Sequence, residues 1–171
     1  AQIATLARQL PVRFEGGQVW LGNADVTDAI RTEEAGMNAS RVSALAAVRA
    51  ALVDLQHSFR RLPGLVADGR DMGTVIFPGA ALKVYLTASA ACRAERRYQQ
   101  LIAKGLTATI VDLRADLEAR DARDMSRSVA PLTPAQDALV LDNSELTIEQ
   151  AVDQVLDWWQ QRQPFTPGVQ G

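Results

Sequence analysis

Hydrophobic residues recur along the chain in two spacings, and their order predicts alternating strands and helices. Short apolar runs at residues 65–67, 81–86 and 138–142 are typical of buried strands. Apolar residues three or four positions apart predict amphipathic helices at 1–10, 40–61, 89–104 and 109–124. A last helix is predicted to begin at 147, and residues 164–171 follow it as a tail. Strands that alternate with helices favour an α/β fold with a parallel sheet.

Turn residues divide the first third of the chain. Residues 12–14 and 18–21 flank Glu15-Gly16-Gly17, which predicts a hairpin. We expect a short helix at 25–31 and a loop at 32–38. Ser40 then stands where it would cap the helix 40–61. The apolar stripe of that helix consists of Val42, Leu45, Leu52, Leu55 and Phe59.

Capping residues mark the ends of the later helices. Ser89 stands before the helix that Gly105 ends, and Ala130-Pro131 breaks the helix that begins near residue 109. Thr147 and Gln150 have the spacing of a capping box. The residues of the last helix expected to face the core are Ile148, Val152, Val155, Leu156 and Trp159.

Charged residues interrupt two of the apolar stripes. Arg49 lies between Leu45 and Leu52, and a buried charge requires a partner or a ligand. Snorkelling from the edge of the stripe is the alternative. The stripe formed by Ile110, Leu113 and Leu117 continues as Arg120, Asp124 and Arg127. This change predicts a site, and a solvated ladder of ion pairs is the alternative.

Residues 65–74 carry the most informative polar turn. The apolar run at 65–67 ends in Asp68-Gly69-Arg70-Asp71, and open α/β sheets bind ligands at the carboxyl ends of their strands. Arg70 suits a phosphate or a carboxylate because its guanidinium is a planar fork. An ordinary Asp-Gly turn with solvated charges is the alternative.

Composition limits the classes of function. The 171 residues suffice for one domain, 47% are hydrophobic, and the net charge of −2 disfavours a nucleic-acid polymer as partner. No apolar run approaches the roughly 18 residues of a membrane span. The single cysteine, Cys92, fits a cytoplasmic location, and one histidine, His57, gives almost no support to a Cys/His metal site or a Ser/His/Asp triad. Lys83 and Lys104 are the only lysines among 18 basic residues, a bias that phosphate binding or a GC-rich genome would produce.

The chain resembles the bacterial cytidylate kinases over nearly its whole length. The most specific matches are the Asp-Gly-Arg-Asp-x-Gly-Thr run at 68–74 and the arginine–aspartate helix. The matching segments are Asp25-Val26-Thr27, Ile30-Arg31, Ala39-Ser40, Val48-Arg49, 67–74, Phe77-Pro78, 86–89, Arg120-Asp121, Arg123-Asp124 and 130–132. The resemblance implies transfer of the γ-phosphoryl of ATP to CMP or dCMP, with Mg²⁺ as a cofactor.

The resemblance also implies an architecture. It is an α/β fold with a P-loop kinase-type parallel sheet, helices on both faces, a small antiparallel β/helix insert that binds CMP, and an α-helical lid. The insert would cover 11–61, the core 62–97 and 128–163, and the lid 98–127, within one domain and a monomeric enzyme.

The roles of single residues follow from the same resemblance. Ser40, Arg49 and Asp71 would contact the cytosine, with Arg127 close by. Arg120 and Asp124 would reach the sugar, and Arg70 and Arg127 the phosphate. Arg70, Arg120 and Arg127 would be the catalytic residues. Asp68 would hold Mg²⁺ through water.

One feature of the family has no match among the 171 residues. The family opens with Gly-x-x-x-x-Gly-Lys-[Ser/Thr], and neither lysine here follows a glycine. No residues that bind ATP are therefore predicted, and we expect the first strand and the phosphate loop to be absent. Gly79 also replaces a usual aspartate. A kinase lacking its N-terminal segment, which would not phosphorylate CMP alone, and an inactive fragment with a pyrimidine-nucleotide pocket both fit, whereas a nucleic-acid-binding module is disfavoured.

Overall fold

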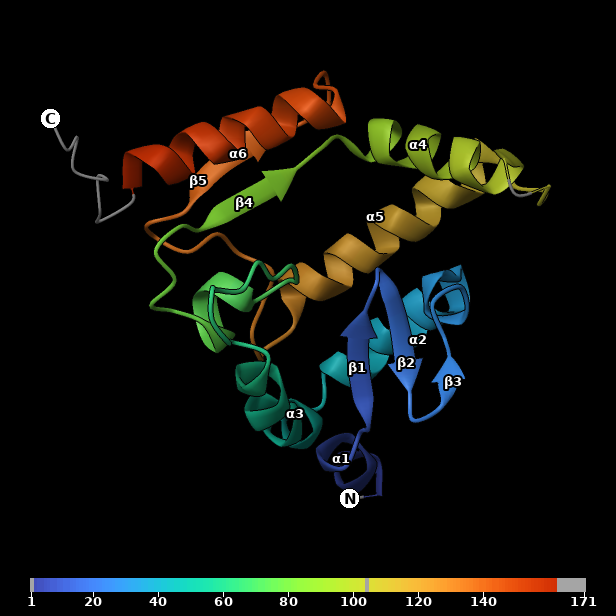
Figure 1. Ribbon diagram of the computed structural model, residues 1–171. Coiled ribbons are helices and arrows are strands. Elements are labelled where there is room, and N and C mark those ends of the chain that lie inside the picture. Colours follow the sequence, from blue (N-terminus) through green and yellow to red (C-terminus); the bar gives the residue numbers. More distant parts are fainter. Residues whose placement is uncertain (1, 104, 163–171) are drawn as a thin grey trace, which may run out of the picture. The chain divides into compact units, whose positions relative to one another are not determined.

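A computed structural model describes residues 2–103 and 105–162, and Figure 1 shows the course of the chain. These residues form two compact units. The first comprises the described residues up to Arg70 together with Ala122–Pro131, and the second comprises Asp71–Asp121 and the described residues from Leu132 onward. The first unit contains an antiparallel sheet and the second a pair of parallel strands. The predicted boundaries of insert, core and lid stay a prediction.

The hairpin of the first unit forms where the sequence predicts it. After helix α1 (Gln2–Arg8), strand β1 (Val12–Glu15) pairs with β2 (Gln18–Leu21), and β2 pairs with the short β3 (Ala24–Asp25). Gly16 and Gly17 have φ values of 58° and 79°, which a two-residue hairpin turn requires. The helix expected at 25–31 is only the 3₁₀ turn η1 (Ala29–Arg31), because β3 and its turn use the first residues.

The single helix predicted at 40–61 is wrong, because two helices occupy this region. Helix α2 (Glu33–Ser43) begins inside the expected loop 32–38, and α3 (Ala46–Ser58) follows. Thr32 caps α2 by accepting a hydrogen bond from the Ala35 N–H at 3.2 Å, and Glu33 and Glu34 favour the first turn. Ser40 is therefore not a cap. It lies within α2, and only 5% of it is exposed.

A small hydrophobic core joins α1 to α3 in the first unit. Ala7, Val48 and Ala51 are buried there, and the half-buried Val42 and Leu52 pack against them. Leu45, expected on the same stripe, is 46% exposed because it stands at the break between α2 and α3. The predicted stripe is therefore partly right.

The strand expected at residues 65–67 is not present in the structure. This segment has no regular secondary structure, and Val66 is fully exposed. A strand requires a neighbour that pairs with its backbone groups, and no segment of the described residues pairs with this one. Beyond it, Asp71 precedes a π-helical turn, η2 (Met72–Ile76).

The sheet of the second unit consists of β4 (Val84–Thr87) and β5 (Leu139–Asp142), which pair in parallel. Both strands were expected and expected to be buried. Leu141 is 6% exposed, but Leu86 and Val140 are about 60% exposed. The expectation of buried strands is thus only partly correct, because burial depends on what covers each face.

Helices α4 (Ala90–Ala103) and α5 (Ile110–Ser126) follow the predicted periodicity. Ser89 Oγ accepts a hydrogen bond from the Cys92 N–H at 3.2 Å, which confirms the cap of α4. The expected last residue of that helix, Lys104, lies outside the described residues. Arg93 and Arg96 tie α4 into the second unit through Asp121 at 2.6 Å and Asn143 at 3.0 Å.

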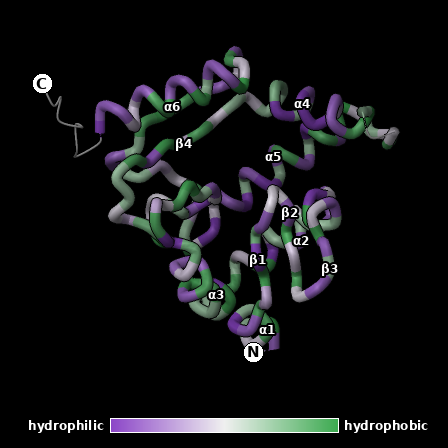
Figure 2. Tube along the Cα trace, in the orientation of Figure 1, coloured by the Kyte–Doolittle hydropathy of each residue, from purple (hydrophilic) through white to green (hydrophobic). Residues whose placement is uncertain are grey.

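Helix α6 (Ile148–Arg162) begins with the predicted capping box. The Thr147 N–H donates to Gln150 Oε1 at 2.9 Å, and the Gln150 N–H donates to Thr147 Oγ1 at 3.2 Å. Figure 2 shows hydrophobic and hydrophilic residues alternating along this helix. Most of its expected core-facing residues are nevertheless exposed, among them Ile148 at 80% and Leu156 at 49%. Periodicity identifies an apolar face but not whether another element covers it.

Candidate functional site

The buried carboxylate of Asp124 is the centre of a polar network in the first unit. Only 1% of Asp124 is exposed. Its Oδ1 accepts a hydrogen bond from Ser40 Oγ at 2.8 Å, and its Oδ2 accepts one from Arg70 Nε at 2.7 Å. Arg127 Nη1 lies 3.8 Å from Oδ1. This burial excludes a solvated ion-pair ladder at the end of α5.

The surroundings of Asp124 keep it ionised. Burial alone raises the pKa of its carboxyl group. The hydrogen bonds from Arg70 and Ser40 and the positive charges of Arg70 and Arg127 outweigh burial, so the pKa lies below its ordinary value. The carboxylate is thus negatively charged near neutral pH, and it orients its cationic neighbours.

Arg127 is held on two of its three nitrogen atoms. Its side chain is 7% exposed. Nε donates to the Ala130 carbonyl at 2.5 Å, and Nη1 donates to Ser43 Oγ at 3.1 Å. Nη2 is buried and has no hydrogen-bond partner among the described residues. A buried guanidinium donor without an acceptor is costly, and such a donor suits an anionic ligand.

Arg49 supplies a second inward positive charge, from helix α3. Its Nη1 donates to the Ser43 carbonyl at 3.4 Å. Burial, and then the positive charge of Arg127, lowers the pKa of the Arg49 guanidinium. Like charges are brought close at a structural cost, so two neighbouring arginines favour an anion between or beside them.

Sequence reasoning gave no role to two further members of the network. Arg123 Nη1 donates to Ser40 Oγ at 3.2 Å, and Ser43 contacts both Arg49 and Arg127. The three-residue spacing of Ser40 and Ser43 on one helix was the available signal for Ser43. We call the whole set the Asp124 network. Its members are Ser40, Ser43, Arg49, Arg70, Arg123, Asp124 and Arg127.

The other predicted site residues belong to the second unit or lie in the exposed segment. Asp71 is 6% exposed, and its carbonyl accepts hydrogen bonds from the three backbone N–H groups of residues 74–76. Arg120 is half-buried on α5, and Asp68 is exposed. The structure therefore brings together five of the seven predicted CMP-binding residues in the first unit. The other two, Asp71 and Arg120, belong to the second unit.

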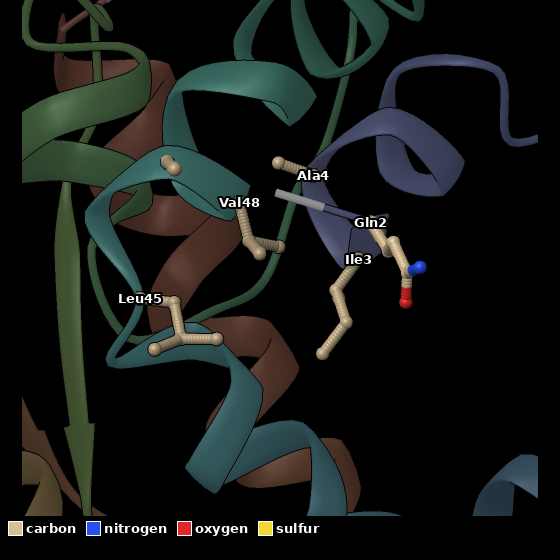
Figure 3. A pocket seen from close by; sticks show the side chains of 6 residues that line it. Gln2, Ile3, Ala4, Leu45 and Val48 are labelled. Atoms are coloured by element: carbon tan, nitrogen blue, oxygen red, sulfur yellow. The ribbon is translucent and has the colours of Figure 1, made fainter.

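A cavity of about 320 Å³ lies elsewhere in the first unit, against α1 and the start of α3. Figure 3 shows Ile3, Ala4, Leu45 and Val48 around it. Its lining is mainly apolar and includes none of the predicted site residues. We place the chemistry at the Asp124 network, because catalysis on nucleotides requires charged donors that this cavity lacks.

Comparison with known proteins identifies the family. The family model for cytidylate kinase matches residues 1–161. The chain is 57% identical to the cytidylate kinase of Ralstonia pickettii (strain 12J) over 161 residues, which are 94% of this chain and 70% of that protein. The chain belongs to the cytidylate kinase family.

Two further relatives agree with this assignment to the cytidylate kinases. The cytidylate kinase of Cupriavidus necator is 58% identical over 157 residues, covering 92% of this chain and 71% of that protein. That of Polynucleobacter asymbioticus is 57% identical over 159 residues, covering 93% and 72%. The mixed α/β structure with its parallel pair of strands is consistent with the P-loop kinase fold expected of the family. In the described part of the chain, no helix is both long and apolar enough to cross a membrane.

Proposed function

We propose that the Asp124 network binds the ribose and phosphate of CMP or dCMP during phosphoryl transfer from ATP. The network contains four guanidinium groups and one carboxylate, which leaves a surplus of positive charge for an anionic ligand. The observation that carries the proposal is the buried Nη2 of Arg127, which has no protein acceptor among the described residues. A cytidylate kinase provides the matching anion, a nucleoside monophosphate.

The residue chemistry suits this reaction. The phosphate oxygen of CMP that attacks the γ-phosphoryl group of ATP is already anionic near neutral pH, so no general base is required. Transfer then depends on positioning and on stabilising charge in the transition state. Arg70 and Arg127 act on the phosphate, and together with Arg120 they are the catalytic residues of this proposal. The products are CDP or dCDP and ADP.

The remaining contacts of the nucleotide follow the same proposal. Ser40, Arg49 and Asp71 contact the cytosine, and Arg120 and Asp124 the sugar. Asp124 suits this role because a carboxylate accepts about four hydrogen bonds. Ser40 and Arg70 supply two of them, and a sugar hydroxyl can supply another.

The residues suit a Mg²⁺ ion that keeps its water ligands, and not one bound directly by several protein side chains. No cluster of three or more His, Cys, Asp or Glu side chains able to hold a metal occurs among the described residues. Mg²⁺ keeps several waters and is commonly held by one or two carboxylates plus substrate phosphates. Asp68, an exposed carboxylate, would hold it through water. When bound, the ion neutralises charge on the phosphates of ATP.

The proposal extends to the setting of the enzyme. A cytoplasmic location is supported by the single cysteine, Cys92, which cannot form an internal disulfide. We propose a monomer as the working state.

The test compares CMP with cytidine by calorimetric titration of the 171-residue chain. Both ligands present the same base and sugar, so the ratio of their affinities reports the phosphate contacts. We expect CMP to bind more tightly, and Arg127→Met to remove most of this preference, by about tenfold or more, because a charged hydrogen bond is lost.

Arg114→Met is the matched control. Arg114 lies in α5, the helix that ends just before Arg127. It is exposed and pairs with Glu118 at 2.7 Å, outside the Asp124 network. This variant should keep the wild-type preference. Equal affinity of the wild-type chain for CMP and cytidine would refute the proposal.

A further inference from the structure

Ser43, the last residue of helix α2, contacts both inward arginines of the first unit. Its Oγ donates to the Ser40 carbonyl at 2.9 Å and accepts from Arg127 Nη1 at 3.1 Å. Its carbonyl accepts from Arg49 Nη1 at 3.4 Å. One residue thus contacts two guanidinium groups, one from helix α3 and one from the residue that follows the end of α5.

The break between α2 and α3 makes the second contact possible. In a continuous helix, the Ser43 carbonyl would accept a hydrogen bond from the N–H group four residues later. The chain leaves the helix at Ala44, and Leu45 has extended backbone angles (φ −85°, ψ 109°) before α3 begins. The Ser43 carbonyl therefore accepts from Arg49 instead.

The Ser43 hydroxyl is oriented before it meets Arg127. A hydroxyl group has one proton, and this one is used on the Ser40 carbonyl. Its lone pairs are then directed at Arg127 Nη1. Together with the bond from Arg127 Nε to the Ala130 carbonyl, this contact fixes the plane of the guanidinium and hence the position of Nη2.

We propose that Ser43 is a positioning residue for phosphate recognition in this cytidylate kinase. It would set Arg127 Nη2 for the phosphate of the monophosphate substrate. The inference rests on the proposed function above, because it assigns Arg127 to that phosphate.

Ser43→Ala tests the hydroxyl contact by calorimetric titration with CMP and with cytidine. The variant should weaken CMP binding by about tenfold, the usual loss for a hydrogen bond to a charged group, and leave cytidine binding unchanged. A purely structural role would weaken both ligands alike. Ser43→Thr keeps the hydroxyl and should restore the preference for CMP, so a failure of Ser43→Thr to do so contradicts the proposal.

Ser58→Ala is the matched control. Ser58 ends α3 as Ser43 ends α2. The Ser58 Oγ also donates to the carbonyl three residues earlier, that of Leu55, at 2.7 Å, but Ser58 is exposed. This control should bind CMP as the wild-type chain does. An equal loss in Ser58→Ala and Ser43→Ala would overturn the positioning role.

A measurement without ligand separates the two proposals. Nitrogen-15 relaxation of the Arg127 Nε–H group reports the mobility of its guanidinium directly. We expect the Arg127 guanidinium to be more mobile in Ser43→Ala than in the wild-type chain, and equally mobile in Ser58→Ala and the wild-type chain. Unchanged mobility overturns the role of Ser43, whereas equal binding of CMP and cytidine by the wild-type chain overturns the assignment of the phosphate to Arg127.

Discussion

At the scale of single residues, the sequence predicted the members of the Asp124 network that carry distinctive chemistry. Asp124, Arg127 and Arg49 interrupt apolar stripes, and this pattern is visible without a structure. Ser43 and Arg123 were missed for a physical reason. Their contacts are with other protein groups, so their importance depends on distances between segments about 80 residues apart in sequence, which no local pattern encodes.

The lowered pKa of Asp124 predicts an acid-sensitive first unit. The unfolded carboxyl titrates near pH 3.9, whereas the folded one titrates lower, so the unfolded chain binds more protons in this range. The contribution of Asp124 to stability is complete above that pH and is lost as the pH falls through the folded pKa. We expect Asp124→Asn to destabilise the protein by about 1–3 kcal/mol near pH 7 and to flatten the dependence of its stability on pH below about 4.

Urea unfolding across this pH range measures the effect. Asp25→Asn is the comparison, because hydrogen bonds from Thr27 also lower the pKa of Asp25, but this carboxyl group is exposed. Solvation weakens its contribution, so its variant should change the pH dependence less. A steeper pH dependence in Asp124→Asn than in the wild-type chain would contradict the prediction.

At the scale of elements, turns and caps that depend on neighbouring residues were predictable from the sequence. Helix boundaries for which several residues could serve as the cap were not. The Gly16-Gly17 turn and the Thr147–Gln150 box each need only neighbouring residues, and both formed as expected. Helix α2 began earlier than predicted because Thr32, and not Ser40, caps its first turn. The apolar run at 65–67 failed as a strand because pairing requires a partner that its own sequence cannot specify.

The capping box of α6 is open to a double-mutant cycle. Thr147→Ala should destabilise the second unit by about 1 kcal/mol, since it removes the acceptor for the Gln150 N–H. Gln150→Ala removes the reciprocal bond to the Thr147 N–H. We expect the double variant to lose less than the sum of the two single losses, as measured by thermal unfolding. Strict additivity would show that the two bonds do not cooperate.

At the scale of the whole molecule, the chain divides into two units, and five of the predicted CMP-binding residues belong to the first. The sequence favoured one domain and gave no sign of this division into units. The division depends on which distant segments contact one another in the fold, and composition does not specify those contacts. The fold class was predictable, since alternating strands and helices led to the parallel pair β4–β5.

Thermal unfolding with CMP tests this division. A ligand that binds only the folded state stabilises it by about 2.7 kcal/mol at 100 times its dissociation constant. For a chain of 171 residues this corresponds to a rise of about 5–10 °C in the midpoint. If calorimetry shows two transitions, CMP should shift the one that belongs to the first unit more. Cytidine at the same concentration should shift it less, and an equal shift by both would contradict a phosphate contact.

The interruption between α2 and α3 also bears on how this protein can be stabilised. Substitutions that extend α2 through Ala44 and Leu45 would add helical hydrogen bonds and would look favourable to any procedure that optimises stability alone. They would also return the Ser43 carbonyl to the helix and withdraw it from Arg49. The irregular junction is therefore a place where selection for heat resistance and selection for substrate affinity should pull in opposite directions.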